Sequence, residues 1–300
     1  MAELIPGTSH FELYKHHDRF WKDYEYVYPV LSRRSQGISV GININPDGNC
    51  NFHCVYCQVD PEKTRKGSVI CLEKLREELE TCVTWAVRGD IFSHEIFRNV
   101  PPELRRVNDV AFSGDGEPTI CPLFEEAVHV VTQVRRKLVE HGENEVIRRA
   151  AEEMKLVLIT NSTQFRKPKI REILSDFRKN HGEIWAKLDA GTEAYYKKIN
   201  RSGVPFHEIL AGITEVARQQ PVVIQTLFCL YEGAPSEEEL RAYIERIREI
   251  TAAGGMIDYI QLHSVCRRTA EASCQQIPPE ELKCIGQEIF NRTDVKVEVF

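Results

Sequence analysis

The chain has 300 residues, of which 42% are hydrophobic and 28% are charged, and its formal net charge at pH 7 is −6. This composition supports a large folded core and excludes a disordered chain. The negative charge disfavours a protein built around an extended nucleic-acid contact. No apolar run reaches the roughly 18 residues of a membrane span, and the N-terminus lacks the pattern of a secretory signal, so we expect a cytoplasmic protein.

Six short strands rich in Val and Ile are predicted from residue 37 onward, at 38–44, 108–113, 155–160, 183–189, 222–228 and 257–263. They are apolar on both faces, as expected of strands buried in a parallel sheet. Helices are predicted near 72–88, 122–141, 168–179, 206–219 and 235–252, and a further helix is predicted in EELKCIGQEIF after Pro278-Pro279. Residues 89–107 and 142–154 are predicted to be insertions, and the final VKVEVF is predicted to add an edge strand.

The alternation of strands and helices predicts an α/β fold. Right-handed crossovers curve repeated βαβ units toward a barrel, and eight pairs would close it. Six pairs predict a partial, open (β/α)6 TIM-type barrel. We expect an N-terminal cap segment at 1–36, the barrel core at 37–265, and a C-terminal extension packed on the core at 266–300.

Three of the ten cysteines, Cys50, Cys54 and Cys57, fall within one short loop after the first predicted strand. This is the end of a βα barrel that carries the chemistry. Three thiolates on one loop can ligate three irons of a [4Fe–4S] cluster and leave the fourth iron for a cofactor or substrate. The alternative is structural zinc, with His53 or a distant cysteine as fourth ligand, but such sites favour paired Cys-x-x-Cys elements and a second pair is absent.

The remaining cysteines are more widely spaced. In a reducing compartment they are expected to be thiols, and Cys71, Cys82 and Cys121 are predicted to be small buried apolar residues. The spacing of the C-terminal group leaves two interpretations open, an auxiliary iron–sulfur cluster or buried packing. That group consists of Cys229, Cys266, Cys274 and Cys284.

Polar residues follow the later strands at the same end of the predicted barrel. In SGDGEPT (113–119), glycines allow close backbone approach, and carboxylates can accept hydrogen bonds from a ligand ammonium. The plainer interpretation is a glycine-rich turn, and the polar ends of the next strands can equally reflect turn chemistry or a satisfied ion pair. The candidate residues are Gly114, Asp115, Gly116, Glu117, Asn161, Lys187, Asp189 and Gln225, with Thr160, Ser162, Thr226, Gln261 and His263 beside them.

The Cys-x3-Cys-x2-Cys spacing, with Tyr56 directly before the last cysteine, resembles the signature of the radical S-adenosylmethionine (SAM) superfamily. The resemblance covers about residues 28–265 and is to the branch of wyosine (tRNA) synthase-like proteins. It is carried by VLSRRSQGISVGIN, FSGDGEPT, LITNST, KLDAGTEAYYKKINR and IQLHSV. It implies a [4Fe–4S] cluster on the three cysteines, with SAM chelating the free iron. One electron would then split SAM into methionine and a 5′-deoxyadenosyl radical.

The same resemblance implies SAM contacts along the strand ends. Glu117 would receive the amino group, beside the backbone of Gly114, Asp115 and Gly116. Asn161, Lys187 and Asp189 would contact the ribose and carboxylate. Tyr56 and Gln225 complete the expected cofactor-binding set.

The substrate is less well defined by the sequence. The wyosine synthases carry a second cysteine set before the SAM-cluster cysteines, whereas no cysteine precedes Cys50 here. We therefore expect a small-molecule or peptide substrate, with a flavodoxin- or ferredoxin-type reductant and no membrane partner. Two alternatives stay open, a tRNA base-modifying enzyme and a non-catalytic iron–sulfur protein for binding or electron transfer.

Overall fold

The computed structural model describes residues 3–4, 21–60, 62, 64–269 and 271–300. In these ranges the strands form one sheet in the order β1-β9-β8-β7-β6-β5-β4-β3-β2. All neighbouring strands are parallel except β2, which pairs antiparallel with β3. The strands are β1 (Glu3–Leu4), β2 (Val27–Ser32), β3 (Gly37–Ile42), β4 (Val107–Phe112), β5 (Lys155–Thr160), β6 (Gly182–Lys187), β7 (Val222–Leu227), β8 (Ile257–His263) and β9 (Val297–Val299).

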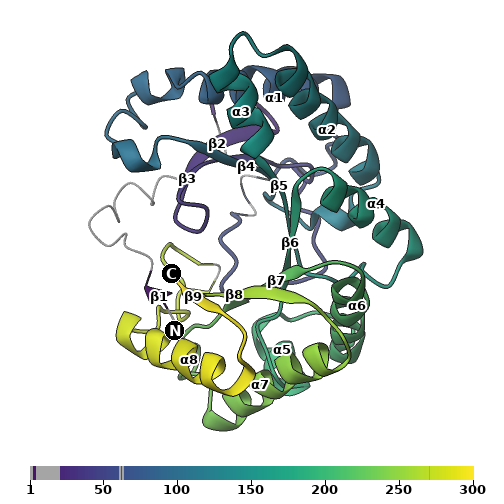
Figure 1. Ribbon diagram of the computed structural model, residues 1–300. Coiled ribbons are helices and arrows are strands. Elements are labelled where there is room, and N and C mark those ends of the chain that lie inside the picture. The colour runs from purple at the N-terminus through teal and green to yellow at the C-terminus, as the bar shows by residue number, and fades with distance from the viewer. Residues whose placement is uncertain (1–2, 5–20, 61, 63, 270) are drawn as a thin grey trace.

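The sheet curves round an open interior, and the long helices lie on its outer side (Figure 1). The α-helices are α1 (Leu72–Val87), α2 (Phe124–His141), α3 (Glu145–Glu153), α4 (Pro168–Lys179), α5 (Glu193–Ile199), α6 (Phe206–Gln219), α7 (Glu237–Ala252) and α8 (Pro279–Thr293). Short 3-10 turns lie at η2 (Asp90–Ser93), η3 (Pro102–Leu104) and η4 (Pro118–Ile120). Within the described ranges, every helix is too short or too polar to cross a membrane.

The predicted fold class is confirmed, and each of the six predicted strands is present within two residues at either end. The sheet is larger than predicted because segments outside the predicted core join it. Residues 27–32, expected in the N-terminal cap, form β2, and the final segment forms β9 beside β8. The remainder of the predicted cap at 1–2 and 5–20 lies outside the described residues.

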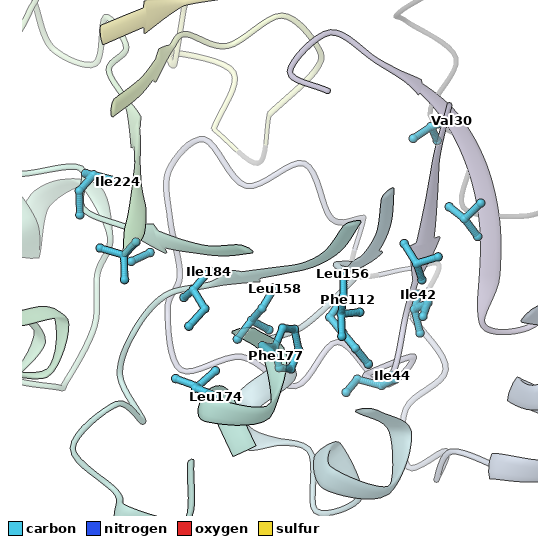
Figure 2. Packing of buried hydrophobic residues seen from close by; sticks show 14 of the residues in the cluster. Val30, Ile42, Ile44, Phe112, Leu156, Leu158, Leu174, Phe177, Ile184 and Ile224 are labelled. Atoms are coloured by element: carbon cyan, nitrogen blue, oxygen red, sulfur yellow. The ribbon is translucent and has the colours of Figure 1, made fainter. Parts of the chain in front are cut away.

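Alternating strand residues divide the molecule into an outer core and an inner cavity. Phe112, Leu158 and Ile184 point outward and pack against the helices, where the Phe112 and Phe177 ring centroids lie 5.9 Å apart (Figure 2). Their neighbours along the strands, including Ala111 and Trp185, form a separate inner cluster. The outer face therefore holds the fold together and leaves the inner face free to line a site.

Candidate functional site

A cavity of about 580 Å³ lies inside the curved sheet, and Cys50, Cys54 and Cys57 all line it. This volume falls within the roughly 300–1,000 Å³ typical of small-molecule sites. The cysteine loop follows β3 at the carboxyl edge of the parallel strands, as the sequence predicted. The three thiols therefore face one enclosed space together with the ends of the neighbouring strands.

The cysteine loop is held in place by the C-terminal end of α5, a helix that the sequence analysis did not predict. The His53 N–H donates to the Asn200 carbonyl at 2.9 Å, and the Val55 N–H donates to the Ile199 carbonyl at 2.9 Å. Val55 is also fully buried in a small apolar cluster. These contacts fix the backbone of the loop. The protein itself therefore helps to position the three sulfurs.

Two of the three sulfurs accept hydrogen bonds from this framework. The Phe52 N–H lies 3.4 Å from Cys50 Sγ, and Asn161 Nδ2 lies 3.9 Å from the same sulfur. Asn200 Nδ2 lies 3.5 Å from Cys54 Sγ. Such donors stabilise thiolates and tune the electronics of a bound cluster.

Burial opposes the ionisation of these thiols in the protein alone. It raises the pKa of Cys50 to about 12 and that of Cys54 to about 11. A metal centre ligates thiolates, so it would supply the positive charge that the surroundings lack. The donor set of three half-buried thiols, two of which accept N–H donors, therefore fits an iron–sulfur cluster.

The zinc alternative gains no support from the described part of the chain. There, no three His, Cys, Asp or Glu side chains stand together as ligands of one metal ion. His53, one of the two kinds of fourth ligand considered for zinc, is exposed. The cysteines of a cubane each bind a different iron, and so they need not converge on one point.

Tyr56 and Asp189 link the cysteine loop to the sheet. The Tyr56 hydroxyl donates to the Asp189 carboxylate, which also accepts from Asn200 Nδ2 at 2.9 Å and from the Leu227 N–H at 2.8 Å. Burial, followed by the charge of Asp189, raises the pKa of Tyr56 well above its usual value. Internal hydrogen bonds thus occupy the Asp189 carboxylate.

Lys187 lies between this link and the cavity. Its ammonium is 3.8 Å from Asp189 Oδ2 and 5.0 Å from the centroid of the Tyr56 ring. Lys187 lines the cavity, whereas Asp189 does not. Of the two, only Lys187 is placed to touch a ligand directly.

Glu117 is buried where the SGDGEPT segment meets β5. One carboxylate oxygen accepts from Thr160 Oγ1 at 2.5 Å and from both the N–H and Oγ1 of Thr119. The other oxygen accepts only the Asn161 N–H, at 2.7 Å. Because a carboxylate oxygen has two acceptor directions, Oε2 can accept one further donor from the cavity. Burial, partly offset by these hydrogen bonds, raises the pKa of Glu117.

The two glycines of SGDGEPT allow this segment to lie against the cysteine loop. A Cβ on Gly116 would collide with the Asn49 carbonyl oxygen. Gly114 has φ of +135°, and a Cβ there would lie 2.5 Å from Asn43 Oδ1. The Glu117 N–H then donates to the Asn49 carbonyl at 2.9 Å. The functional interpretation of the motif therefore has a structural basis beyond a simple turn.

The cavity brings together the predicted site residues other than Asp189. Besides the cysteines, they are Tyr56, Gly114, Asp115, Gly116, Glu117, Asn161, Lys187 and Gln225, with Thr160 and His263 from the weaker group. Ser162, Thr226 and Gln261 do not line it. The Gln225 amide donates to Gln261 at 3.1 Å, which orients the Gln225 side chain.

Sequence reasoning missed several residues of the site. Asn200, which contacts Cys54, Tyr56 and Asp189, lies in the KKINR end of a motif that was recognised but not assigned. Asn51 accepts from Asn161 at 2.6 Å and lies inside the cysteine loop itself. Arg34, Asp109 and Trp185 also line the cavity. They come from the turn after β2 and from within β4 and β6, away from the strand ends that the motifs indicated.

The other cysteines are free thiols with varied environments. Cys82 and Cys121 are buried as predicted, whereas Cys71 is exposed because it directly precedes the first turn of α1. In the C-terminal group, Cys229 and Cys274 are buried in contact with one another, Cys266 lines the cavity, and Cys284 is exposed on α8. The prediction of burial is therefore wrong for Cys71, and of the two interpretations left open for the C-terminal group, buried packing does not describe Cys284.

No protein-family model matches the chain. The protein GTPase Obg of Brachyspira hyodysenteriae is 22% identical over 276 residues, which cover 90% of this chain and 34% of that protein. A UPF0026 protein of Helicobacter pylori is 23% identical over 264 residues, covering 85% and 71%, respectively. A UPF0026 protein of Synechocystis is 27% identical over 190 residues, covering 62% and 57%. The matched part of this chain thus spans about a third of the length of GTPase Obg and a larger share of the length of the two UPF0026 proteins.

Three solved structures resemble the fold. TYW1 with a lysine-pyruvate adduct bound gives a TM-score of 0.52 at 14% identity, covering 95% of this chain and 82% of that chain. Streptococcus suis SuiB bound to S-adenosylmethionine gives 0.55 at 11%, covering 89% and 52%. HydG, a maturase of the [FeFe]-hydrogenase, gives 0.56 at 11%, covering 87% and 50%. At 11–14% identity these likenesses concern the fold alone, and they agree with the partial α/β barrel expected from the sequence.

Proposed function

We propose that this protein is a radical SAM enzyme with Cys50, Cys54 and Cys57 as the ligands of a [4Fe–4S] cluster. With SAM on its open iron, the cluster would supply one-electron reductive cleavage to a 5′-deoxyadenosyl radical, which abstracts hydrogen from a small-molecule or peptide substrate. The observation that carries the proposal is the convergence of three loop cysteines, two strand-end motifs and Lys187 on one cavity within a radical SAM fold.

The residues of this chain would bind and orient SAM from two sides. The free acceptor direction of Glu117 Oε2 suits the SAM ammonium, because an ammonium N–H that donates to a buried carboxylate forms a strong, charge-assisted hydrogen bond. Lys187 carries the opposite charge and suits the SAM carboxylate. Asn161 and Gln225 offer amides to the ribose or to the remaining carboxylate oxygen. Asp189 acts as a positioning residue, since its carboxylate holds Tyr56 and the cysteine loop.

The polar groups that line the site support catalysis over simple electron transfer. Cys50 and Cys54 lie in a cavity whose wall also carries hydrogen-bonding groups suited to an amino acid and a ribose. A protein that only carries electrons has no need for such groups.

The proposal includes a small-molecule or peptide substrate, a flavodoxin- or ferredoxin-type reductant and a cytoplasmic location. All ten cysteines are free thiols, which supports a reducing compartment. The tRNA alternative rests on the motif resemblance to the wyosine synthase-like branch, and the likeness to TYW1, at 14% identity, concerns the fold alone.

Anaerobic reconstitution with iron and sulfide, followed by dithionite and SAM, tests the proposal. We expect 5′-deoxyadenosine and methionine to form in equal amounts. Cys54→Ala should lose both the cluster absorbance and the products, whereas Cys71→Ala, which changes an exposed cysteine outside the cavity, should retain both. An intact cluster that yields no 5′-deoxyadenosine would leave a binding or electron-transfer protein as the better explanation.

A further inference from the structure

Cys266 is a thiol of the cavity wall that neither the proposed cluster nor the proposed SAM contacts use. It lies three residues beyond the end of β8 and is half-buried. Among the ten cysteines, those that line the cavity are Cys266 and the three of the cysteine loop. A fourth thiol therefore shares the space in which the proposed radical would form.

The segment that carries Cys266 is anchored on the cysteine loop. The preceding residue, Val265, is buried in one small apolar cluster with Val55 and Tyr56 of that loop. Further along the same segment, the Glu271 N–H donates to the Val55 carbonyl at 3.1 Å. Cys266 therefore lies between two contacts that hold its segment against the loop of the proposed cluster.

The end of β8 that leads to Cys266 is also held firmly. The Phe228 N–H donates to the His263 carbonyl at 3.0 Å. Ser264 Oγ donates to the Phe228 carbonyl at 2.6 Å and accepts the Ile277 N–H at 2.9 Å. Transfer of a hydrogen atom requires the two reacting groups to be in contact, so it depends on a backbone that holds the donor in place.

Two polar atoms of the same wall have no hydrogen-bond partner among the described residues. They are His263 Nε2 and Asp109 Oδ2, and both are buried. Their residues line the cavity together with Cys266. A buried polar atom without a partner costs free energy, and a ligand that bonds to it removes this cost. Since His263 is three residues before Cys266, a substrate bonded to it would lie close to the thiol.

We propose that Cys266 is the catalytic hydrogen-atom donor of this site and returns a hydrogen atom to the substrate radical. This inference rests on the proposed function. The S–H bond of a thiol is weaker than the C–H bond that a carbon radical forms, so the transfer runs toward the product. The transfer changes the net charge of neither partner, and the acids and bases of the cavity therefore do not decide it.

The reaction balances in atoms and electrons. The 5′-deoxyadenosyl radical removes a hydrogen atom from the substrate, and the resulting substrate radical takes the hydrogen atom of the Cys266 thiol. The S–H bond breaks, a C–H bond forms and a thiyl radical remains on the sulfur. One electron from the flavodoxin- or ferredoxin-type reductant and one proton from solvent then restore the thiol. The substrate is therefore isomerised, rearranged or cleaved without net oxidation.

Cleavage of SAM in heavy water, without a substrate, tests the donor directly. A thiol exchanges its hydrogen with solvent, so the adenosyl radical should take deuterium from Cys266. Mass spectrometry should find most of the 5′-deoxyadenosine singly deuterated at its 5′ carbon. Cys266→Ser and Cys266→Ala should lose this label, because a serine O–H bond is too strong to donate and alanine has no such hydrogen. Cluster absorbance equal to that of the parent shows that both variants are folded.

Tyr28 is the competing donor, because its phenol also lines the cavity and exchanges its hydrogen with solvent. Its hydroxyl is bonded to Ser113 Oγ at 2.9 Å. Tyr28→Phe should retain the label, and Cys284→Ser, at an exposed position on α8, should match the parent. A label that persists in both Cys266 variants, or that disappears in Tyr28→Phe, would contradict the proposal.

Alkylation gives a readout that needs no turnover. Iodoacetamide should modify Cys266 in the reconstituted, unreduced protein, and bound SAM should slow this reaction because both occupy one cavity. Cys284 should react at the same rate with and without SAM. Unchanged alkylation of Cys266 would contradict the proposal, as would 5′-deoxyadenosine that forms without deuterium in the parent. An intact cluster that forms no 5′-deoxyadenosine would instead overturn the proposed function itself.

Discussion

The Asn200 amide donates to Cys54 Sγ at 3.5 Å and to the Asp189 carboxylate at 2.9 Å. One side chain at the end of α5 therefore contacts both a proposed cluster ligand and the carboxylate that holds Tyr56. The same residue receives the His53 N–H on its backbone carbonyl, so it orders the cysteine loop from both its side chain and its main chain.

Replacing Asn200 by Ala should leave the cluster bound but make its reduction potential more negative. A lost N–H···S hydrogen bond leaves more negative charge on the sulfur, and a hydrogen bond of about 1 kcal/mol corresponds to a shift on the order of 40 mV for one electron. Anaerobic potentiometric titration measures it. Asn180→Ala, at the end of α4 and bonded to Asp176, is the matched control. An unchanged potential in Asn200→Ala would show that this donor does not tune the cluster.

Glu117→Gln should weaken SAM binding about tenfold or more while leaving the iron content close to that of the parent. The amide loses the charge that would hold an ammonium, and its NH2 group cannot accept the donors now bonded to one of the two oxygens. Calorimetric titration with SAM gives the affinity, and thermal unfolding should show a loss of about 1–3 kcal/mol. Glu126→Gln, exposed in the first turn of α2, should change neither quantity. Parental SAM affinity in Glu117→Gln would remove this residue from the cofactor site.

Gly116→Ala should reduce both cluster yield and SAM affinity. The added methyl group would strike the Asn49 carbonyl oxygen and the Asn45 Cβ, so the SGDGEPT segment and the cysteine loop must separate. Iron analysis after reconstitution measures the yield. Gly203→Ala is the matched control, because its added Cβ meets nothing within 4 Å. Equal yields in the two variants would mean that the close approach at Gly116 is not required.

The stability of the protein should fall as the pH rises from about 4 to 6 through the titration of Asp109. Burial, partly offset by the Ser39 hydroxyl, raises the pKa of this carboxyl to about 6. Because the folded state then holds the proton more tightly than the unfolded state, the contribution is present at low pH and is lost as the pH passes the folded pKa.

Asp109→Asn should lack this part of the pH dependence. The difference between parent and variant should change by about 2–3 kcal/mol between pH 4 and 7. Urea unfolding at several pH values measures it, with Asp176→Asn on the surface of α4 as control. A constant difference across this range would contradict the raised pKa.

The repeating part of the fold could be predicted because its strands are short apolar runs separated by amphipathic helices. The strands and helices that were not predicted from the sequence lack this pattern. β2 contains Pro29 and stands alone before the first βα unit, and α5 has only one and a half to two turns. α3 lies in a segment whose many charges suggested a connecting insertion, yet Ile147 and Ala151 on one face are buried against the core.

The site was predictable where side chains follow strands in sequence order, as with Cys50, Glu117 and Lys187. It was not predictable where the role of a side chain depends on which neighbours it contacts in the folded protein. The two-residue spacing of Lys187 and Asp189 is compatible with both side chains facing the cavity. Only the three-dimensional contacts show that Asp189 bonds to Tyr56 and does not line the cavity. Arg34 was assigned no role in the site because a basic pair such as Arg33-Arg34 usually belongs to a solvated face of a loop or helix.

Electron paramagnetic resonance of the reconstituted, dithionite-reduced protein tests the central claim most directly. We predict the signal of a reduced [4Fe–4S] cluster whose g values change when SAM is added, because SAM would bind the iron that Cys50, Cys54 and Cys57 leave free. A cluster signal that is identical with and without SAM, at SAM concentrations that saturate the protein by calorimetry, would contradict this account.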